Sequence, residues 1–240
     1  MSEDIEVQFG MAKVRKYAVS ASGDTFEMVE RPHGGVSFVL VDGQRSGKSA
    51  KTVSNLVARK AIQLLGEGVR DGAAARAAHD YLYTYRGGKV TATLNITSVD
   101  RESRTFVISR NNPAPVVLYT PDGGLTELDE PSRGVGTGRR VKPIITELPI
   151  MAGCMLVVFT DGLRHAGTLS GKERYDYLTA VQGLLDTGIR DPQTIADALL
   201  AGAVAQDDGR PRDDISVLVI MALPNEQESL VRRLSGRISL

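Results

Sequence analysis

Several aspartates stand beside the most apolar runs of this chain, in a pattern that suits metal binding. The acids that directly adjoin such runs are Asp42, Asp161, Asp213 and Asp214. A further acid, Asp24, lies in a Ser-Gly-Asp-Thr segment that leads to the first run. A charge at the end of a buried strand is unfavourable unless another group compensates it. Carboxylates that converge at one sheet edge hold hard divalent cations, which prefer oxygen ligands. A turn or cap role is the alternative for any single acid, and it is favoured for Asp24 taken alone.

A second chemistry is suggested by the segment of residues 36–50, VSFVLVDGQRSGKSA. Its Gly47-Lys48-Ser49 resembles the end of the phosphate-binding loop of a nucleotide hydrolase, and Asp161 resembles that enzyme's magnesium-binding acid. Such a loop needs four residues between its glycines, whereas only three separate Gly43 from Gly47. The loop is one residue short, and this interpretation gives Asp24 and Asp213 no role.

The elements that must position the acids follow from apolar periodicity. Helical spacing predicts helices over Ser49–Leu65, Asp71–Tyr85, Lys172–Leu185 and Pro192–Ala205. Strands are predicted over Val36–Val41 and Ile215–Ala222, and as three hairpins: Val90–Val99 with Thr105–Ser109, Val116–Tyr119 with Leu125–Leu128, and Ile144–Leu148 with Met155–Phe159. A run of antiparallel strands between groups of helices indicates an α+β fold. Nucleotide hydrolases with a phosphate-binding loop need a mostly parallel sheet instead.

Composition bounds the cellular setting. The chain of 240 residues has 29 basic and 29 acidic residues, so net charge gives no reason to expect nucleic acid or an anionic membrane as partner. Its single cysteine, Cys154, excludes an intrachain disulfide. The acidic N-terminus does not have the layout of a signal peptide, and no apolar run is long enough to span a bilayer. We therefore expect a cytoplasmic protein.

Four motifs together resemble the metal-dependent serine/threonine phosphatases of the PPM family. They are Ser22-Gly23-Asp24-Thr25, Asp42-Gly43-x-x-Ser46-Gly47, Phe159-Thr160-Asp161-Gly162 and Asp213-Asp214-Ile215-Ser216. Weaker similarities are Thr91-Ala92-Thr93 and the turn of residues 109–115. The pattern is most similar to the bacterial SpoIIE, RsbU and RsbX branch, and closest in layout to RsbX. It covers nearly the whole chain, which predicts a phosphatase domain over residues 1–223 and a C-terminal tail over residues 224–240.

The resemblance implies a four-layer αββα sandwich of two antiparallel sheets flanked by helices. It also implies two divalent cations, Mn²⁺ or Mg²⁺, which activate a water for hydrolysis of phosphoserine or phosphothreonine. Asp42 and the Gly43 carbonyl, Asp161 and Asp213 would bind these ions, with Asp24 as a direct or water-mediated ligand. The implied partner is a phosphorylated regulatory protein, of STAS type, in stress or partner-switching signalling.

Arg45 departs from the family pattern, which has glycine at this position. An arginine at this position predicts either strained backbone in the family's turn or a turn of different conformation. Arg45 is also a candidate phosphate contact, and His165 a candidate donor to the leaving group, although a surface histidine is the simpler reading. Because of Arg45, the alternative of a degenerate phosphatase that binds a phosphoprotein without cleaving it remains open.

Overall fold

Two antiparallel sheets form the centre of the protein, in a computed structural model that describes residues 5–225, 233–234 and 236–237. The first sheet has the order β1 (Ile5–Val14), β10 (Ile215–Pro224), β9 (Met155–Phe159), β6 (Val116–Thr120) and β7 (Gly124–Leu128). The second has the order β2 (Asp24–Glu30), β3 (Val36–Gly43), β4 (Ala92–Asp100), β5 (Thr105–Asn111) and β8 (Ile144–Pro149).

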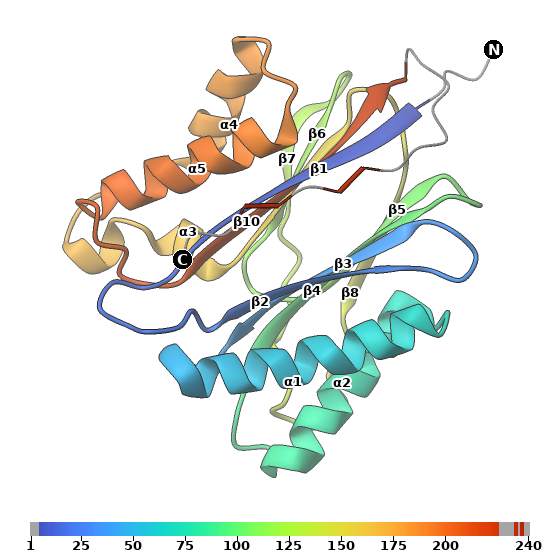
Figure 1. Ribbon diagram of the computed structural model, residues 1–240, viewed down its shortest axis with the longest axis vertical. Coiled ribbons are helices and arrows are strands. Elements are labelled where there is room, and N and C mark those ends of the chain that lie inside the picture. Colours follow the sequence, from blue (N-terminus) through green and yellow to red (C-terminus); the bar gives the residue numbers. More distant parts are fainter. Residues whose placement is uncertain (1–4, 226–232, 235, 238–240) are drawn as a thin grey trace.

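Helices cover the outer face of each sheet, so the molecule has four layers (Figure 1). The second sheet is covered by α1 (Gly47–Gly66) and α2 (Asp71–Arg86), and the first by α4 (Tyr177–Asp186) and α5 (Pro192–Gln206). Two short helices, α3 (Asp161–His165) and the 3-10 helix η1 (Thr168–Ser170), follow β9. The predicted αββα sandwich is confirmed.

Strand β3 illustrates how the sequence builds these layers. Successive side chains of a strand point to opposite faces of the sheet. Phe38 and Leu40 therefore join the core between the two sheets, whereas Val39 and Val41 pack beneath α1 and α2. All four side chains are buried, so residues 38–41 are apolar on both faces of the strand rather than alternating with polar residues. This placement leaves Asp42 as the first charged group at the end of the strand.

The predicted helices over residues 49–65, 71–85 and 192–205 are present with nearly the expected bounds. On α1, Val53, Val57, Ala61 and Leu65 form the buried stripe. α2 ends where Gly87 takes a left-handed conformation, with φ of 60°. The helix predicted over residues 172–185 begins instead at Tyr177, because the Asp176 carboxylate caps it by accepting a hydrogen bond from the Thr179 backbone N–H.

The prediction that Ile144–Leu148 and Met155–Phe159 form a hairpin is wrong. β8 pairs with β5 at the edge of the second sheet, while β9 lies between β10 and β6 in the first. The burial patterns give the physical reason. β8 alternates between partly buried and exposed residues, as an edge strand does, whereas every residue of β9 is buried, as in a central strand. The chain crosses from one sheet to the other between them.

Two strands were not expected from the sequence. β1 pairs with β10 along its whole length, and β2 pairs with β3. Both are edge strands with partly exposed residues, so their apolar pattern is weak. The predicted tail over residues 224–240 falls largely outside the described residues. Among the described helices, none combines the length and apolar character that a membrane crossing requires.

Candidate metal-binding and active site

Acids from both sheets meet at one end of the sandwich. Asp24 at the start of β2 and Asp42 near the end of β3 are direct partners in the second sheet. Asp161 begins α3 just after β9, and Asp213 precedes β10, so both come from the first sheet. Four acids that are far apart in the sequence are thereby brought to one place.

Glycines beside these acids allow the backbones to approach closely. A Cβ on Gly43 would lie 2.1 Å from the Ala50 carbonyl oxygen, and one on Gly162 would lie 2.0 Å from the Asp214 carbonyl oxygen. No real side chain tolerates such distances, so both positions require glycine. The Asp-Gly pairs that resemble turn signals in the sequence are therefore packing signals as well.

Asp24 is fully buried and only half satisfied. Its Oδ2 accepts hydrogen bonds from Thr160 Oγ1 at 2.9 Å and Ser216 Oγ at 2.6 Å. Its Oδ1 is buried, and no donor among the described residues hydrogen-bonds to it. Burial raises the pKa of Asp24 to about 6, against the two hydroxyl hydrogen bonds, which lower it. The turn role favoured for Asp24 alone does not describe this buried strand residue.

Asp42 is the most perturbed acid of the group. Burial, followed by the charges of Asp24, Asp161 and Asp213 in that order, raises its pKa to about 10. The carboxyls of Asp42 and Asp24 are close enough to share a hydrogen bond, which requires a proton on one of them. Without a cation, the cluster therefore relieves its repulsion by keeping a proton.

Asp213 and Asp214 have different environments. The Asp214 carboxylate accepts hydrogen bonds from the backbone N–H groups of Lys16 and Gly23, at 2.9 and 2.8 Å, so it fastens the β1–β2 connection. The Asp213 carboxylate accepts one from the Asp214 N–H at 2.9 Å. Burial and the charge of Asp161 raise the pKa of Asp213. This contrast supports Asp213, rather than Asp214, as the ligand candidate of the pair.

Three of these acids line one pocket of about 440 Å³. Its walls are formed by Lys16, Asp42, Gln44, Arg45, Ser46, Thr91, Ala92, Thr93, Pro113, Gly134, Asp161 and Asp213. The two weaker sequence similarities, around Thr91 and Pro113, thus border the same pocket. Its acids are accompanied by two cations, Lys16 and Arg45, which is a suitable composition for a site that holds metal ions and a phosphoryl group together.

Arg45 lines the pocket with a strained backbone. Its φ of 78° lies in the left-handed region, so the strained turn is the predicted alternative that the structure supports. His165 does not line the pocket. It ends α3 with about half of its side chain exposed, and its Nδ1 lies 4.0 Å from Asp161 Oδ2.

Three lysines near the acids were missed by sequence reasoning. Lys16 lines the pocket, and the Nζ atoms of Lys13 and Lys51 each donate to the Asp24 backbone carbonyl at 2.7 Å. Burial lowers the pKa of both Lys13 and Lys51, while the negative charge of Asp24 opposes that shift. No residue pattern signals a lysine that binds a backbone carbonyl of another strand, so the sequence offered no means of finding this pair.

The donor set fits hard divalent cations with retained waters. In the described part of the chain, no three His, Cys, Asp or Glu side chains are arranged to enclose one ion. Magnesium and similar ions are commonly held by one or two carboxylates, with waters and substrate oxygens completing the shell. Acids around an open pocket, together with the unpaired Asp24 Oδ1, match that pattern better than a closed cage.

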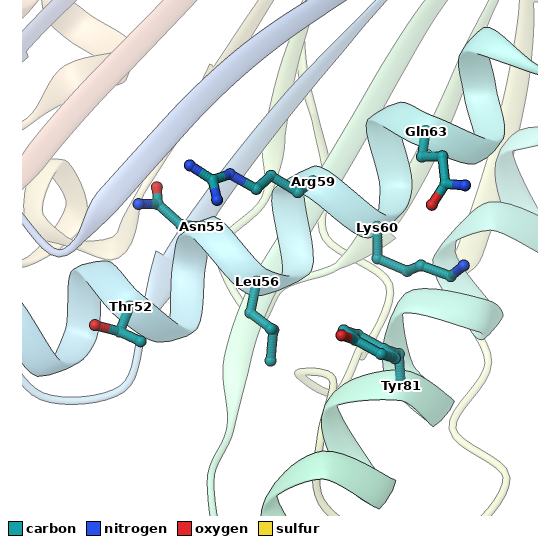
Figure 2. Close-up of a pocket in the computed structure, with 7 residues that line it drawn as sticks. All are labelled: Thr52, Asn55, Leu56, Arg59, Lys60, Gln63 and Tyr81. Carbon is teal, nitrogen blue, oxygen red and sulfur yellow. The ribbon is translucent and has the colours of Figure 1, made fainter.

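A second depression, of about 480 Å³, lies on α1 and α2 (Figure 2). It is lined by Thr52, Asn55, Leu56, Arg59, Lys60, Gln63 and Tyr81. Although it is slightly larger than the acidic pocket, it contains no carboxylate and no residue of the predicted site. Of these two pockets, only the acidic one contains candidate metal ligands.

A family model and a curated relative both indicate the same protein family. The family model described as stage II sporulation protein E (SpoIIE) matches residues 32–222. Stage II sporulation protein E of Priestia megaterium is 22% identical over 218 residues, which cover 89% of this chain and 36% of that protein. The chain thus spans about a third of the length of this relative.

Solved structures show the same fold at low identity. The phosphatase domain of SpoIIE from Bacillus subtilis, with a fragment of its regulatory domain, matches 94% of this chain and 66% of that chain with a TM-score of 0.77 and 20% identity. The catalytic domain of the phosphatase PstP, solved with two manganese ions, has a TM-score of 0.68 at 17% identity, covering 92% of this chain and 100% of that one. RsbX, solved with magnesium, has a TM-score of 0.70 at 17% identity, covering 92% and 99%.

The antiparallel sheets exclude the nucleotide-hydrolase interpretation, because Gly47-Lys48-Ser49 forms the first turn of α1 rather than a phosphate-binding loop after a parallel strand. The family match covers most of the chain, and the fold and the placement of its acids agree with it. The chain belongs to the SpoIIE family, within the PPM-type phosphatase fold.

Proposed function

We propose that this chain is a metal-dependent serine/threonine protein phosphatase that uses two divalent cations, Mn²⁺ or Mg²⁺. The observation that carries the proposal is the convergence of Asp42, Asp161 and Asp213 on one pocket. Their mutual repulsion, expressed in the raised pKa of Asp42, is what a bound cation would remove. The metals in the solved PstP and RsbX complexes support this choice of ions.

In this proposal each residue has a distinct task. Asp42, with the Gly43 carbonyl, Asp161 and Asp213 hold the ions, and Asp24 contributes directly or through water. When bound, such ions lower the pKa of a water and neutralise charge on the phosphoryl group. Arg45 and Lys16 at the pocket wall bind phosphoryl oxygens and orient the phosphorus for attack. His165 is the less supported substrate contact, because it lies outside the pocket lining.

Membership of the SpoIIE family supports a phosphorylated regulatory protein as the substrate. We propose that the substrate is a phosphoserine or phosphothreonine on a regulatory protein, of STAS type, in partner-switching or stress signalling, and that the reaction takes place in the cytoplasm. Residues 1–223 would form the phosphatase domain, with residues 224–240 as its tail. These assignments rest on resemblance, so a panel of phosphorylated STAS proteins is their direct test: dephosphorylation of none of them would contradict the assignment.

A manganese titration with p-nitrophenyl phosphate tests the activity. We expect hydrolysis that needs manganese, that EDTA removes, and that falls at least a hundredfold in Asp42→Asn and in Asp161→Asn. Asp122→Asn, at an exposed turn outside the pocket lining, is the matched control and keeps wild-type turnover. Unchanged turnover in both site variants would overturn the assignment.

The same titration distinguishes an active phosphatase from the alternative, a degenerate phosphatase that only binds a phosphoprotein. Arg45, strained at the pocket wall, is the observation that favours a degenerate phosphatase. Such a protein would bind a phosphopeptide, but it would hydrolyse neither that peptide nor p-nitrophenyl phosphate at any manganese concentration. That combination of results would replace the enzyme by a phosphoprotein-binding module.

A further inference from the structure

The connection from β7 to β8, residues 129–143, is a strap held firmly against the rest of the protein. Hydrogen bonds join it to β5, to α2 and to Thr91, the residue before β4. Those hydrogen bonds are Arg110 Nη2 to the Glu130 carbonyl, Ser132 Oγ to the Arg110 carbonyl at 2.7 Å, Asn111 Nδ2 to the Arg133 carbonyl at 3.0 Å, Thr91 Oγ1 to the Val135 carbonyl at 3.0 Å, and the Gly136 N–H to His79 Nδ1 at 3.0 Å. A connection anchored at this many points has a defined position.

The strap also forms part of the acidic pocket. Val135 is fully buried and exchanges two backbone hydrogen bonds with Ala92, of 3.0 and 2.8 Å. Gly134, next to it, lines the pocket together with Thr91 and Ala92. A Cβ on Gly134 would lie only 2.7 Å from the Ala92 carbonyl oxygen, which reflects how closely the strap packs on β4. Whatever enters the pocket therefore passes beside the strap.

The charge of the strap is unevenly distributed. Its two acids, Asp129 and Glu130, stand at its start, and residues 131–143 carry four basic side chains, Arg133, Arg139, Arg140 and Lys142, and no acid. All four are exposed. No ion pair joins any of them to another residue within the described ranges. Solvated surfaces usually mix both signs, so an unmixed cluster is a departure from an ordinary exposed loop.

The proposed phosphatase activity alone does not use these cations. One phosphoryl group is small enough to be bound by the ions, Arg45 and Lys16 in the pocket. Arg133 directly precedes Gly134 of the pocket lining, so the strap brings positive charge to the pocket wall, where the residues that flank the phosphorylated side chain would bind. Complementary charge across an interface steers encounter and suppresses wrong partners more than it adds affinity.

We infer that the basic strap docks an acidic surface of the phosphoprotein substrate, so that the phosphatase prefers phosphoserines flanked by aspartate and glutamate. This inference rests on the proposed function and specifies its substrate class. The docked group is a protein segment with several carboxylates near the phosphate. Selection occurs through the strap, which is anchored before the substrate arrives and therefore needs no ordering when it binds.

The test compares two phosphoserine peptides of equal length with the full chain and manganese. One peptide has Asp and Glu around the phosphoserine, and the other has Ser and Gln. At low salt we expect kcat/KM to be about tenfold higher for the acidic peptide, a preference that shrinks as salt screens the charges. Equal kcat/KM for the two peptides would overturn the inference.

Charge reversal locates the preference on the molecule. Arg139→Glu with Lys142→Glu reverses two of the four strap cations and avoids Arg140, whose φ of 61° makes substitution there harder to interpret. We expect this variant to lose the preference for the acidic peptide. The control is Arg59→Glu with Lys60→Glu in the α1–α2 depression (Figure 2), which makes the same change of charge elsewhere. Loss of preference in the control, or its survival in the strap variant, would overturn the inference.

Two further measurements keep the results separable. Hydrolysis of p-nitrophenyl phosphate, which has no flanking residues, reports the proposed activity by itself. If the wild-type chain does not hydrolyse it, the proposed function fails, and fluorescence anisotropy of the two labelled peptides then tests docking directly. Tighter binding of the acidic peptide, lost on strap reversal, supports the inference. Equal binding of both peptides contradicts it. Thermal melts of each variant exclude misfolding as the cause.

Discussion

Asp24 and Asp42 face each other as direct partners on β2 and β3, with carboxyls close enough to share a proton. Asp24 is fully buried, and partial burial raises the pKa of Asp42, so both carboxylates are poorly solvated. Lys13 and Lys51 hold the backbone of this pair through the Asp24 carbonyl. The two aspartates are therefore held in fixed positions at the proposed metal site.

Replacing Asp42 by asparagine should stabilise the metal-free protein while it abolishes activity. Burial and neighbouring acids raise the pKa of Asp42 to about 10 in the folded protein, well above its pKa in the unfolded chain. The contribution of the protonated carboxyl to stability is therefore full below about pH 4 and is lost as the pH rises towards 10. At pH 8 we expect Asp42→Asn to melt higher than wild type. A gain of about 1 kcal/mol corresponds to roughly 2–4 °C in Tm for a chain of this size.

Melting curves in EDTA at pH 4 and pH 8 check this prediction. The difference in Tm between Asp42→Asn and wild type should grow with pH. A lower Tm for Asp42→Asn at pH 8 would mean that the Asp42 carboxylate is already satisfied without a cation.

Manganese binding should release protons. A carboxyl must be ionised to bind a cation, and at pH 7 Asp42, with a pKa of about 10, carries a proton, whereas Asp24, with a pKa of about 6, is mostly ionised. We expect close to one proton released per chain at pH 7, and tighter binding as pH rises from 6 to 8. Calorimetric titration in buffers of different ionisation enthalpy measures that number. Binding that neither releases protons nor depends on pH would contradict the site.

Acids at the ends of apolar runs could be recognised from the sequence because both features are local. Asp42, Asp161 and Asp213 each adjoin a buried strand, and the structure does bring them to one pocket. The partner of β9 could not be recognised in the same way. Met155–Phe159 pairs with strands more than thirty residues away on each side, and proximity in sequence to β8 suggested a hairpin that does not form.

The lysines illustrate a second limit of sequence reasoning. Lys13 and Lys51 bind a backbone carbonyl, which every residue possesses, so no pairing of side-chain types announces the contact. Arg45 is intermediate: the family glycine that it replaces pointed to a positive φ, but only the structure distinguishes a strained turn from a rebuilt one.

Arg45→Gly should relieve backbone strain at the pocket wall. A non-glycine residue in the left-handed region costs about 1–2 kcal/mol, partly offset by the greater freedom of glycine in the unfolded chain. We expect a gain of up to about 1 kcal/mol in denaturant unfolding. Arg45→Ala keeps the strain and serves as the control. If Arg45 binds phosphoryl oxygens, both variants should raise KM for p-nitrophenyl phosphate, and an unchanged KM in both would remove that role.

Gly162→Ala should disrupt the site by moving Asp161 away from Asp213. The new Cβ would lie 2.0 Å from the Asp214 carbonyl oxygen, so α3 and the start of β10 must move apart. We expect a loss of at least about 3 kcal/mol in stability and weakened manganese binding. Gly183→Ala on α4 is the matched control: its Cβ meets nothing within 4 Å, and it should leave stability unchanged or raised. Equal effects of the two substitutions would contradict the close packing at Gly162.

The most direct test of the account is anomalous scattering from crystals grown with manganese. We predict two manganese peaks in the pocket of Asp42, Asp161 and Asp213, with Asp42 nearest to both, and none in crystals of Asp42→Asn. Absence of manganese from this pocket in the wild-type protein at saturating concentration, or ions bound only elsewhere, would contradict the proposed metal site and the phosphatase mechanism built on it.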